Sequence, residues 1–224
     1  MKNWILVLLV IAVTANFSAQ TSVADTAYRP KNYDQQVEQF RSYPNSENDI
    51  IFLGNSITAR NHWDELLRMP VAKNRGISGD TTLGMLERLD EITEGNPKKI
   101  FILIGINDIS RNFPDETIIE NYKKILQRIN NESPTTRIYV QTILPVNASF
   151  GVYENHYGKD DHILQINNFL REMKKERDLT IINLHEHFLD TNNLLDAKYT
   201  EDGLHLNANG YQLWAAILKP YLKE

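Results

Sequence analysis

Residues 49–58 read Asp-Ile-Ile-Phe-Leu-Gly-Asn-Ser-Ile-Thr, an apolar run that ends at a glycine, with a serine two residues further on. A short uninterrupted run of this kind is typical of a strand buried in a parallel sheet. Similar runs rich in isoleucine and valine occur at 99–104, 137–142 and 180–184, and a weaker one at 71–75. We therefore predict five strands, of which the quoted stretch contains the first.

Helical segments separate these strands. Apolar residues recur at helical spacing over residues 83–92, 118–129, 163–173 and 208–218. Strand and helix thus alternate along the chain, and the right-handed crossover rule then gives a parallel sheet with helices on both faces. The predicted fold class is α/β, with three layers in the order α/β/α around a five-stranded parallel sheet.

The N-terminus has the features of an export signal. Lys2 precedes an apolar run at 4–13 and the small-residue sequence Phe17-Ser18-Ala19, a pattern typical of a signal peptide. The apolar run is shorter than the roughly 20 residues that a membrane-spanning anchor needs. We predict a signal peptide over residues 1–19 and a periplasmic or extracellular location.

The remaining chain has the size of one catalytic domain. Its 224 residues are 42% hydrophobic and 24% charged, which suits one well-buried domain. We assign residues 20–46, polar and containing two prolines, to a surface segment and residues 47–224 to the domain. The absence of cysteine means that the exported protein is stabilised without disulfides.

The charge balance excludes some partners. Without residues 1–19, which contain only Lys2 among charged residues, 23 basic residues stand against 29 acidic ones, a net charge of −6. No basic stripe is left for nucleic acid, and no later segment is apolar enough to span a membrane. The expected partner is a small-molecule or glycan ester, and the sequence does not indicate an oligomeric state.

A serine, a histidine and an aspartate form the first candidate constellation. Ser56 directly follows a predicted strand and starts a predicted helix, where backbone N–H groups are unpaired. It is a candidate nucleophile, although its position alone also fits a helix cap. Asp202 and His205 are three residues apart, so the carboxylate can reach Nδ1 and leave Nε2 facing a nucleophile.

Two further positions offer hydrogen-bond donors. Asn107 follows a buried strand in Gly105-Ile106-Asn107-Asp108, where its amide can point at a developing oxyanion or form an Asx turn. Gly79 lies where the backbone can approach a ligand closely, although a plain turn explains it equally well. The specific signal is that all these residues occur, in order, near successive strand ends.

The four segments resemble the sequence blocks of the SGNH hydrolase family, also called GDSL-type esterases and lipases. The segments are 54–58, 78–80, 105–108 and 202–205, and the resemblance covers nearly the whole mature chain. The segments Gly-Ile-Ser-Gly-Asp-Thr-Thr and Ile-Gly-Ile-Asn-Asp are similar to the corresponding segments in one branch of this family. That branch contains lysophospholipase-like and platelet-activating-factor acetylhydrolase-like proteins. The resemblance implies a flavodoxin-like sheet, no metal and no cofactor.

It also implies a role for each residue. Ser56 would be the nucleophile, His205 the base and Asp202 the group that orients it. The amides of Ser56 and Gly79 and the side chain of Asn107 would form the oxyanion hole. One departure is Asn55, because the family usually has aspartate before the serine; the change leaves the triad assignment intact.

Other interpretations remain open at this point. Gly54-Asn55-Ser56-Ile57-Thr58 lacks the second glycine of the α/β-hydrolase elbow, which disfavours that family. Ser78 is a second candidate nucleophile. His185 and His187 form a His-x-His pair, but no third metal ligand has evident spacing. A carbohydrate-binding protein without turnover is a further alternative.

The stretch 146–160 indicates the substrate. It contains Asn147, Tyr153, His156 and Tyr157, which we predict to contact a sugar or a small alcohol. We expect a serine ester hydrolase for short-chain acyl esters, chiefly acetyl esters and among them those of carbohydrates. The alternatives are a lysophospholipase- or thioesterase-type lipid acyl hydrolase and an O-acetyltransferase.

Overall fold

A computed structural model describes residues 28–173 and 179–223 of the chain. The predicted signal peptide lies outside these residues. Within the described ranges, no helix is long and apolar enough to cross a membrane.

The five predicted strands form one parallel sheet. Its strand order is β2-β1-β3-β4-β5, and every neighbouring pair is parallel. The strands are β1 (Ile50–Gly54), β2 (Ala72–Gly76), β3 (Lys99–Leu103), β4 (Arg137–Gln141) and β5 (Leu179–Ile182). Each predicted strand lies within two residues of an observed one. Strands β1 and β3 are buried along their whole length, as their uninterrupted apolar runs predict.

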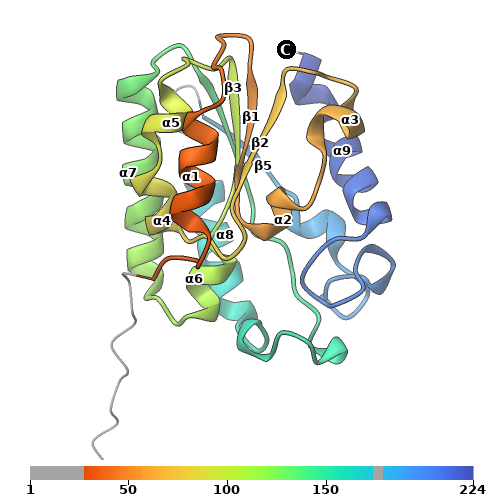
Figure 1. Cartoon of the computed structure of the whole chain (residues 1–224). Coiled ribbons are helices and arrows are strands. Elements are labelled where there is room, and N and C mark those ends of the chain that lie inside the picture. Colours follow the sequence, from red (N-terminus) through yellow and green to blue (C-terminus); the bar gives the residue numbers. More distant parts are fainter. Residues whose placement is uncertain (1–27, 174–178, 224) are drawn as a thin grey trace, which may run out of the picture.

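Helices cover both faces of the sheet, as Figure 1 shows. Helices α1, α4, α5 and α7 lie on one side, α3 and α9 lie on the other, and α8 packs against α7. The helices are α1 (Tyr33–Arg41), α2 (Ser56–Ala59), α3 (Trp63–Leu67), α4 (Thr82–Glu87), α5 (Asp90–Thr93), α6 (Ile106–Ser110), α7 (Asp115–Glu132), α8 (Asp160–Glu172) and α9 (Ala208–Lys223). The predicted three-layer α/β/α architecture is confirmed.

An aromatic ladder joins the sheet to the helices of one face. Phe52, Phe101 and Tyr139 occupy matching positions on β1, β3 and β4, and their rings stack at centroid distances of 5.2 and 4.5 Å. Trp63 of α3 stacks on Phe52 at 4.0 Å, and Trp214 of α9 meets Trp63 edge-on at 4.7 Å. Such large buried rings dominate the energy of a core.

The strand order places a crevice at the carboxyl end of the sheet. The chain moves from β1 outward to β2 and then crosses back to β3 on the other side of β1. Between β1 and β3 the connections therefore leave in opposite directions, and ligands of open α/β sheets bind at such a switch point. Ser56 follows β1 and Asn107 follows β3.

The prediction of one continuous helix over residues 83–92 is wrong. The stretch consists of two short helices, α4 and α5, and Arg88 follows the end of α4 with φ −110° and ψ 16°. Its guanidinium is fully buried and bonds to Asp80, Glu91 and two backbone carbonyls. These long-range bonds favour a break that the local apolar spacing does not indicate.

The segment at 20–46 also contains more structure than its polar composition suggested. Residues Tyr33–Arg41 form helix α1, and Tyr33, Val37 and Phe40 form a small buried cluster with Ile77. Three apolar side chains at helical spacing were the available signal. The segment therefore covers the turn after β2 with a helix.

Candidate active site

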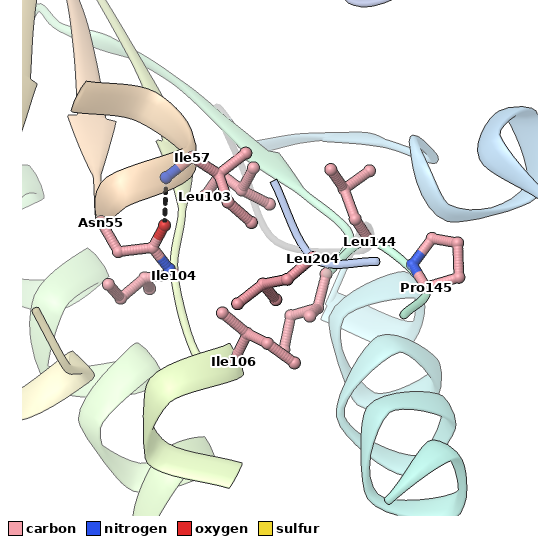
Figure 2. A pocket seen from close by; sticks show the side chains of 9 residues that line it. Asn55, Ile57, Leu103, Ile104, Ile106, Leu144, Pro145 and Leu204 are labelled. Carbon is pink, nitrogen blue, oxygen red and sulfur yellow. Dashed lines mark hydrogen bonds between the residues drawn. The ribbon is translucent and has the colours of Figure 1, made fainter. Parts of the chain in front are cut away.

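The turn after β1 presents Ser56 at the start of a helix. Asn55 has extended backbone and caps α2, and its Oδ1 accepts a hydrogen bond from the Ile57 amide at 3.0 Å (Figure 2). An aspartate would accept the same bond, so the departure at Asn55 keeps the cap while removing a negative charge beside Ser56. The cap leaves the Ser56 amide at the open end of the helix.

Ser56, His205 and Asp202 lie in one hydrogen-bonded line. Ser56 Oγ lies 3.0 Å from Nε2 of His205, and Nδ1 of His205 lies 2.8 Å from Oδ2 of Asp202. Since a carboxylate only accepts, Nδ1 carries the hydrogen and Nε2 is left to accept the hydroxyl proton. The sequence separates Ser56 from His205 by 149 residues, and only the fold joins them.

The loop that carries Asp202 fixes its direction. Asp202 Oδ1 accepts from the amides of Leu204 and His205 at 3.0 and 2.7 Å, which leaves Oδ2 for the imidazole. Arg60 Nη1 lies 3.7 Å from the same Oδ2. Burial lowers the pKa of His205 below its ordinary 6.5; Arg60 acts in the same direction and Asp202 opposes it. His205 is therefore neutral, and able to accept a proton, at neutral pH.

The turns after β2 and β3 carry the other two candidate donors, Gly79 and Asn107. Asn107 is buried in the first turn of α6, and its Nδ2 donates to the carbonyl of Asp80 at 2.8 Å. Gly79 has φ +82°, and a Cβ there would lie 3.3 Å from Pro30 Cγ. Within residues 28–173 and 179–223, no group accepts a hydrogen bond from the amide of Ser56 or Gly79. These two amides and the second hydrogen of Asn107 Nδ2 are free for an oxyanion.

A buried ionic network fixes the turns that carry these donors. Nε of Arg88 lies 3.0 Å from Oδ2 of Asp80, and Nη1 lies 3.1 Å from Oε1 of Glu91. Nη2 donates to the carbonyls of Gly54 and Arg75, the former at the end of β1. One side chain thus joins the strand before Ser56 to the turn after Gly79. Sequence reasoning missed Arg88, because a charge on a predicted helix is usually solvated.

A third buried carboxylate, that of Asp108, joins α6 to α4. Asp108 follows Asn107 and accepts from the amide and the hydroxyl of Thr82 at 3.0 and 2.5 Å. Asn121 of α7 donates in turn to the Thr82 hydroxyl at 2.9 Å. Burial raises the pKa of Asp108 from 3.8 to about 7, although the Thr82 hydrogen bonds oppose the shift. In the sequence, the feature that could have pointed to Asp108 is its position directly after Asn107.

The structure corrects the substrate contact predicted for Asn147. Its side chain is only 4% exposed, and Nδ2 donates to the Leu195 carbonyl at 2.8 Å. Oδ1 accepts from the amide and hydroxyl of Ser149, and the Asn147 amide donates to the Gly203 carbonyl. An amide with both ends engaged holds the loop to its neighbours and has little left for a ligand.

Three other predicted substrate contacts, Tyr153, His156 and Tyr157, lie at the site. The Tyr153 ring is 5.1 Å from the His205 ring, and His156 Nε2 is 3.3 Å from Asn107 Oδ1. The Tyr157 hydroxyl donates to the Asp202 carbonyl at 3.0 Å. Each is half-buried, so these side chains support the site as well as bordering it.

The other candidate residues, Ser78, His185 and His187, lie outside this line of contacts. Ser78 is exposed, whereas Ser56 is the serine in contact with His205. His185 is buried, and its Nδ1 lies 2.8 Å from the Ile143 carbonyl, the contact of a packed imidazole. His187 is exposed. In the described part of the chain, no three histidine or acidic side chains gather as a metal site would require.

A small cavity lined mostly by apolar side chains lies between Asn55, Ile106 and Leu144 (Figure 2). Its volume is about 10 Å³, roughly that needed for one water-sized group. Its walls include Ile57, Ile106 and Leu204, which are the chain neighbours of Ser56, Asn107 and His205.

Comparison with known proteins shows the family of the chain. A sequence model described as the GDSL-like Lipase/Acylhydrolase family matches residues 52–213. The Platelet-activating factor acetylhydrolase IB subunit alpha2 of Rattus norvegicus is 27% identical over 180 residues, which cover 78% of this chain and 74% of the relative.

Solved structures are also similar to this chain. A Streptococcus pneumonia protein named for platelet activating factor has 30% identity and a TM-score of 0.76, covering 86% of this chain and 93% of that chain. A GDSL-like lipase from Bacteroides thetaiotaomicron has 20% identity and a TM-score of 0.75, covering 86% and 97%. The second likeness shows a shared fold. The family model spans most of the domain, and this chain belongs to the GDSL-like Lipase/Acylhydrolase family, the SGNH hydrolases, and is a carboxylic ester hydrolase.

Proposed function

We propose that the protein hydrolyses short-chain acyl esters, chiefly acetyl esters, through an acyl-enzyme on Ser56. The observation that carries this proposal is the line of contacts from Ser56 Oγ through His205 to Asp202, at 3.0 and 2.8 Å. A nucleophile, a general base and an orienting carboxylate in this order are the parts that acyl transfer needs.

The reaction proceeds in two displacements. Ser56 Oγ attacks the ester carbonyl carbon while its proton passes to Nε2 of His205. The resulting oxyanion accepts hydrogen bonds from the amides of Ser56 and Gly79 and from Nδ2 of Asn107. The intermediate expels the alcohol, which takes the proton from His205. Water then attacks the acyl carbon, gives a proton to His205, and releases the acid as Ser56 regains its hydrogen.

The shape of the site favours a short acyl group. We infer that the acyl methyl enters the cavity bordered by Ile57, Ile106 and Leu204, which has room for about one water-sized group. A longer acyl chain would have to displace packed side chains, and overpacking a core costs roughly 1–3 kcal/mol. The named activity of the rat relative, an acetylhydrolase, supports the same acyl group.

The loop beside the site supports a polar alcohol. A hollow of about 330 Å³ is lined by residues 151–156, including Tyr153 and His156. An aromatic ring next to hydrogen-bonding groups suits a sugar ring, and this volume lies in the range of small-ligand sites. We therefore place acetylated carbohydrates among the substrates.

A lipid ester is the second candidate. The platelet-activating factor acetylhydrolases favour it, because that name joins the acetyl group to a lipid mediator. Both candidates share the acyl group and differ in the alcohol that leaves.

A substrate panel separates the two candidates. We expect kcat/KM on p-nitrophenyl acetate to exceed that on the octanoate by tenfold or more, because about 1.4 kcal/mol of overpacking corresponds to tenfold. Acetylated sugars should then be turned over faster than an acetylated phospholipid. Ser56→Ala is the control and should abolish both activities. A preference for octanoate would overturn the short-chain proposal, and a preference for the phospholipid would favour the lipid alternative.

Export remains part of the proposal. The signal peptide over residues 1–19 predicts a mature chain that begins at Gln20 and acts outside the cytoplasm. The intact mass of protein recovered from the medium or periplasm tests this, and a full-length mass there would contradict it.

A further inference from the structure

The amide of Asn107 has two ends that are alike in shape, and only one of them serves the reaction. Nδ2 donates hydrogen bonds, whereas Oδ1 accepts them and would repel an oxyanion. Nδ2 gives one hydrogen to the Asp80 carbonyl at 2.8 Å and keeps the second. Oδ1 lies 3.3 Å from Nε2 of His156. The imidazole therefore faces the end of the amide that must point away from the oxyanion.

We propose that His156 is a positioning residue for the oxyanion donor: its Nε2–H donates to Asn107 Oδ1 and holds Nδ2 toward the reacting carbonyl. The inference rests on the proposed function, since it concerns the same reaction. A hydrogen bond accepted by Oδ1 also polarises the amide and strengthens Nδ2–H as a donor.

The surroundings of His156 fix the required tautomer. Because the amide oxygen only accepts, the hydrogen must lie on Nε2. Nδ1 is buried, and within the described residues it has no hydrogen-bond partner, so a proton there would lack an acceptor. Burial, with the charges of His205, Lys159 and Arg111, lowers the pKa of His156 from 6.5 to about 4. His156 is thus a neutral donor over the pH range in which His205 acts as a base.

The segment that carries His156 is braced against the triad. The Tyr153 ring meets the His156 ring at 5.8 Å and the His205 ring at 5.1 Å, both edge-on. The Tyr157 hydroxyl accepts from the Tyr153 amide at 3.2 Å and donates to the Asp202 carbonyl at 3.0 Å. The position of His156 is therefore tied to that of the base.

The same segment is tied to the helix that carries Asn107. Nζ of Lys159 donates to the carbonyls of Ile109 and Ser110 at 3.0 and 2.8 Å, at the C-terminal end of α6. A cation at this end also interacts favourably with the helix dipole. Helix, amide and imidazole are thus held by one stretch of seven residues, 153–159.

A double-mutant cycle on p-nitrophenyl acetate tests the proposal. His156→Leu removes the donor, and we expect kcat to fall about 3- to 10-fold with unchanged KM, the effect of one neutral hydrogen bond. His156→Gln keeps a donor of similar reach and should recover most of this loss. In an Asn107→Ala background, His156→Leu should have no further effect, because the residue that it positions is gone. Gln165→Leu, an exposed change on the neighbouring helix α8, is the matched control and should leave kcat unaltered.

The outcomes are distinct. An equal loss from His156→Leu with and without Asn107 would overturn the proposal, and so would a rise in KM at constant kcat, which would make His156 a substrate contact. A His156→Gln variant as slow as His156→Leu would also refute it. Failure of the proposed function is recognised separately, by the absence of any ester hydrolysis that depends on Ser56.

A second measurement needs no turnover. Nitrogen-15 NMR of the imidazole rings should show His156 as the neutral Nε2–H tautomer from pH 5 to 8, and its Nε2 signal should shift in Asn107→Ala. The Nδ1–H tautomer, or a positive charge at pH 6, would contradict the assignment.

Discussion

Replacing Arg88 with methionine should destabilise the protein strongly and in a pH-dependent way. The Arg88 side chain is 0% exposed and bonds to Asp80, Glu91 and two backbone carbonyls. Methionine fills much of the volume but leaves the buried Asp80 carboxylate without its ion-pair partner. Glu91 keeps its partner Arg75 at 3.2 Å, so Asp80 bears most of the loss.

The expected loss of stability follows from the burial of the Arg88–Asp80 ion pair. Breaking a buried ion pair by removing one partner costs about 3–5 kcal/mol, a large part of the roughly 5–15 kcal/mol that stabilise a typical domain. Burial raises the pKa of Asp80, and Arg88 opposes the shift. Without Arg88 the folded-state pKa rises further, so the variant loses stability as pH rises above the ordinary value of 3.8 toward that raised pKa. The loss relative to wild type should therefore be greater at pH 8 than at pH 5, by about 1 kcal/mol or more.

Urea denaturation at pH 5 and pH 8 measures this effect. Arg41→Met is the matched control, because Arg41 pairs with Asp90 at 2.8 Å but the two side chains are 48% and 52% exposed. That change should cost less than about 1 kcal/mol at either pH. Adding Asp80→Asn to Arg88→Met should recover part of the loss, since the unpaired charge is then removed. A loss below about 1 kcal/mol at pH 8, or equal losses at both pH values, would refute the reasoning.

Further predictions concern turnover, pH and the backbone. Asn107→Ala should lower kcat roughly 10²- to 10³-fold while circular dichroism stays native-like, and near-normal turnover would remove Asn107 from the oxyanion hole. Because His205 must be neutral and its pKa is lowered by burial, kcat/KM should rise with pH through a midpoint below 6.5; a profile flat from pH 5 to 8 would disagree. Gly105 has φ +116°, and a Cβ there would lie 2.7 Å from Ile143 Cδ1, so Gly105→Ala should lower stability by about 1–2 kcal/mol or more in urea. An unchanged urea midpoint would show that this turn tolerates a side chain.

The central strands of the sheet were predictable because a strand buried on both faces is an uninterrupted apolar run in the sequence. The apolar runs at 99–104 and 137–142 match β3 and β4 to within one residue. The serine, glycine, asparagine and Asp-x-x-His segments were also evident locally, since each follows a strand or turn that the sequence reveals. The break at Arg88 was not, because the groups that cause it come from positions 54, 75, 80 and 91.

For this protein, the sequence by itself determined the strand count, the parallel α/β class and the residue types of the site, because periodicity and turn chemistry act over a few residues. Only the tertiary structure decided that Ser56, rather than Ser78, lies against His205, that Asn147 supports the loop, and that His156 faces Asn107. The physical reason is that hydrogen bonds and ion pairs form over about 3 Å in space, while their partners here lie 48 to 149 residues apart along the chain.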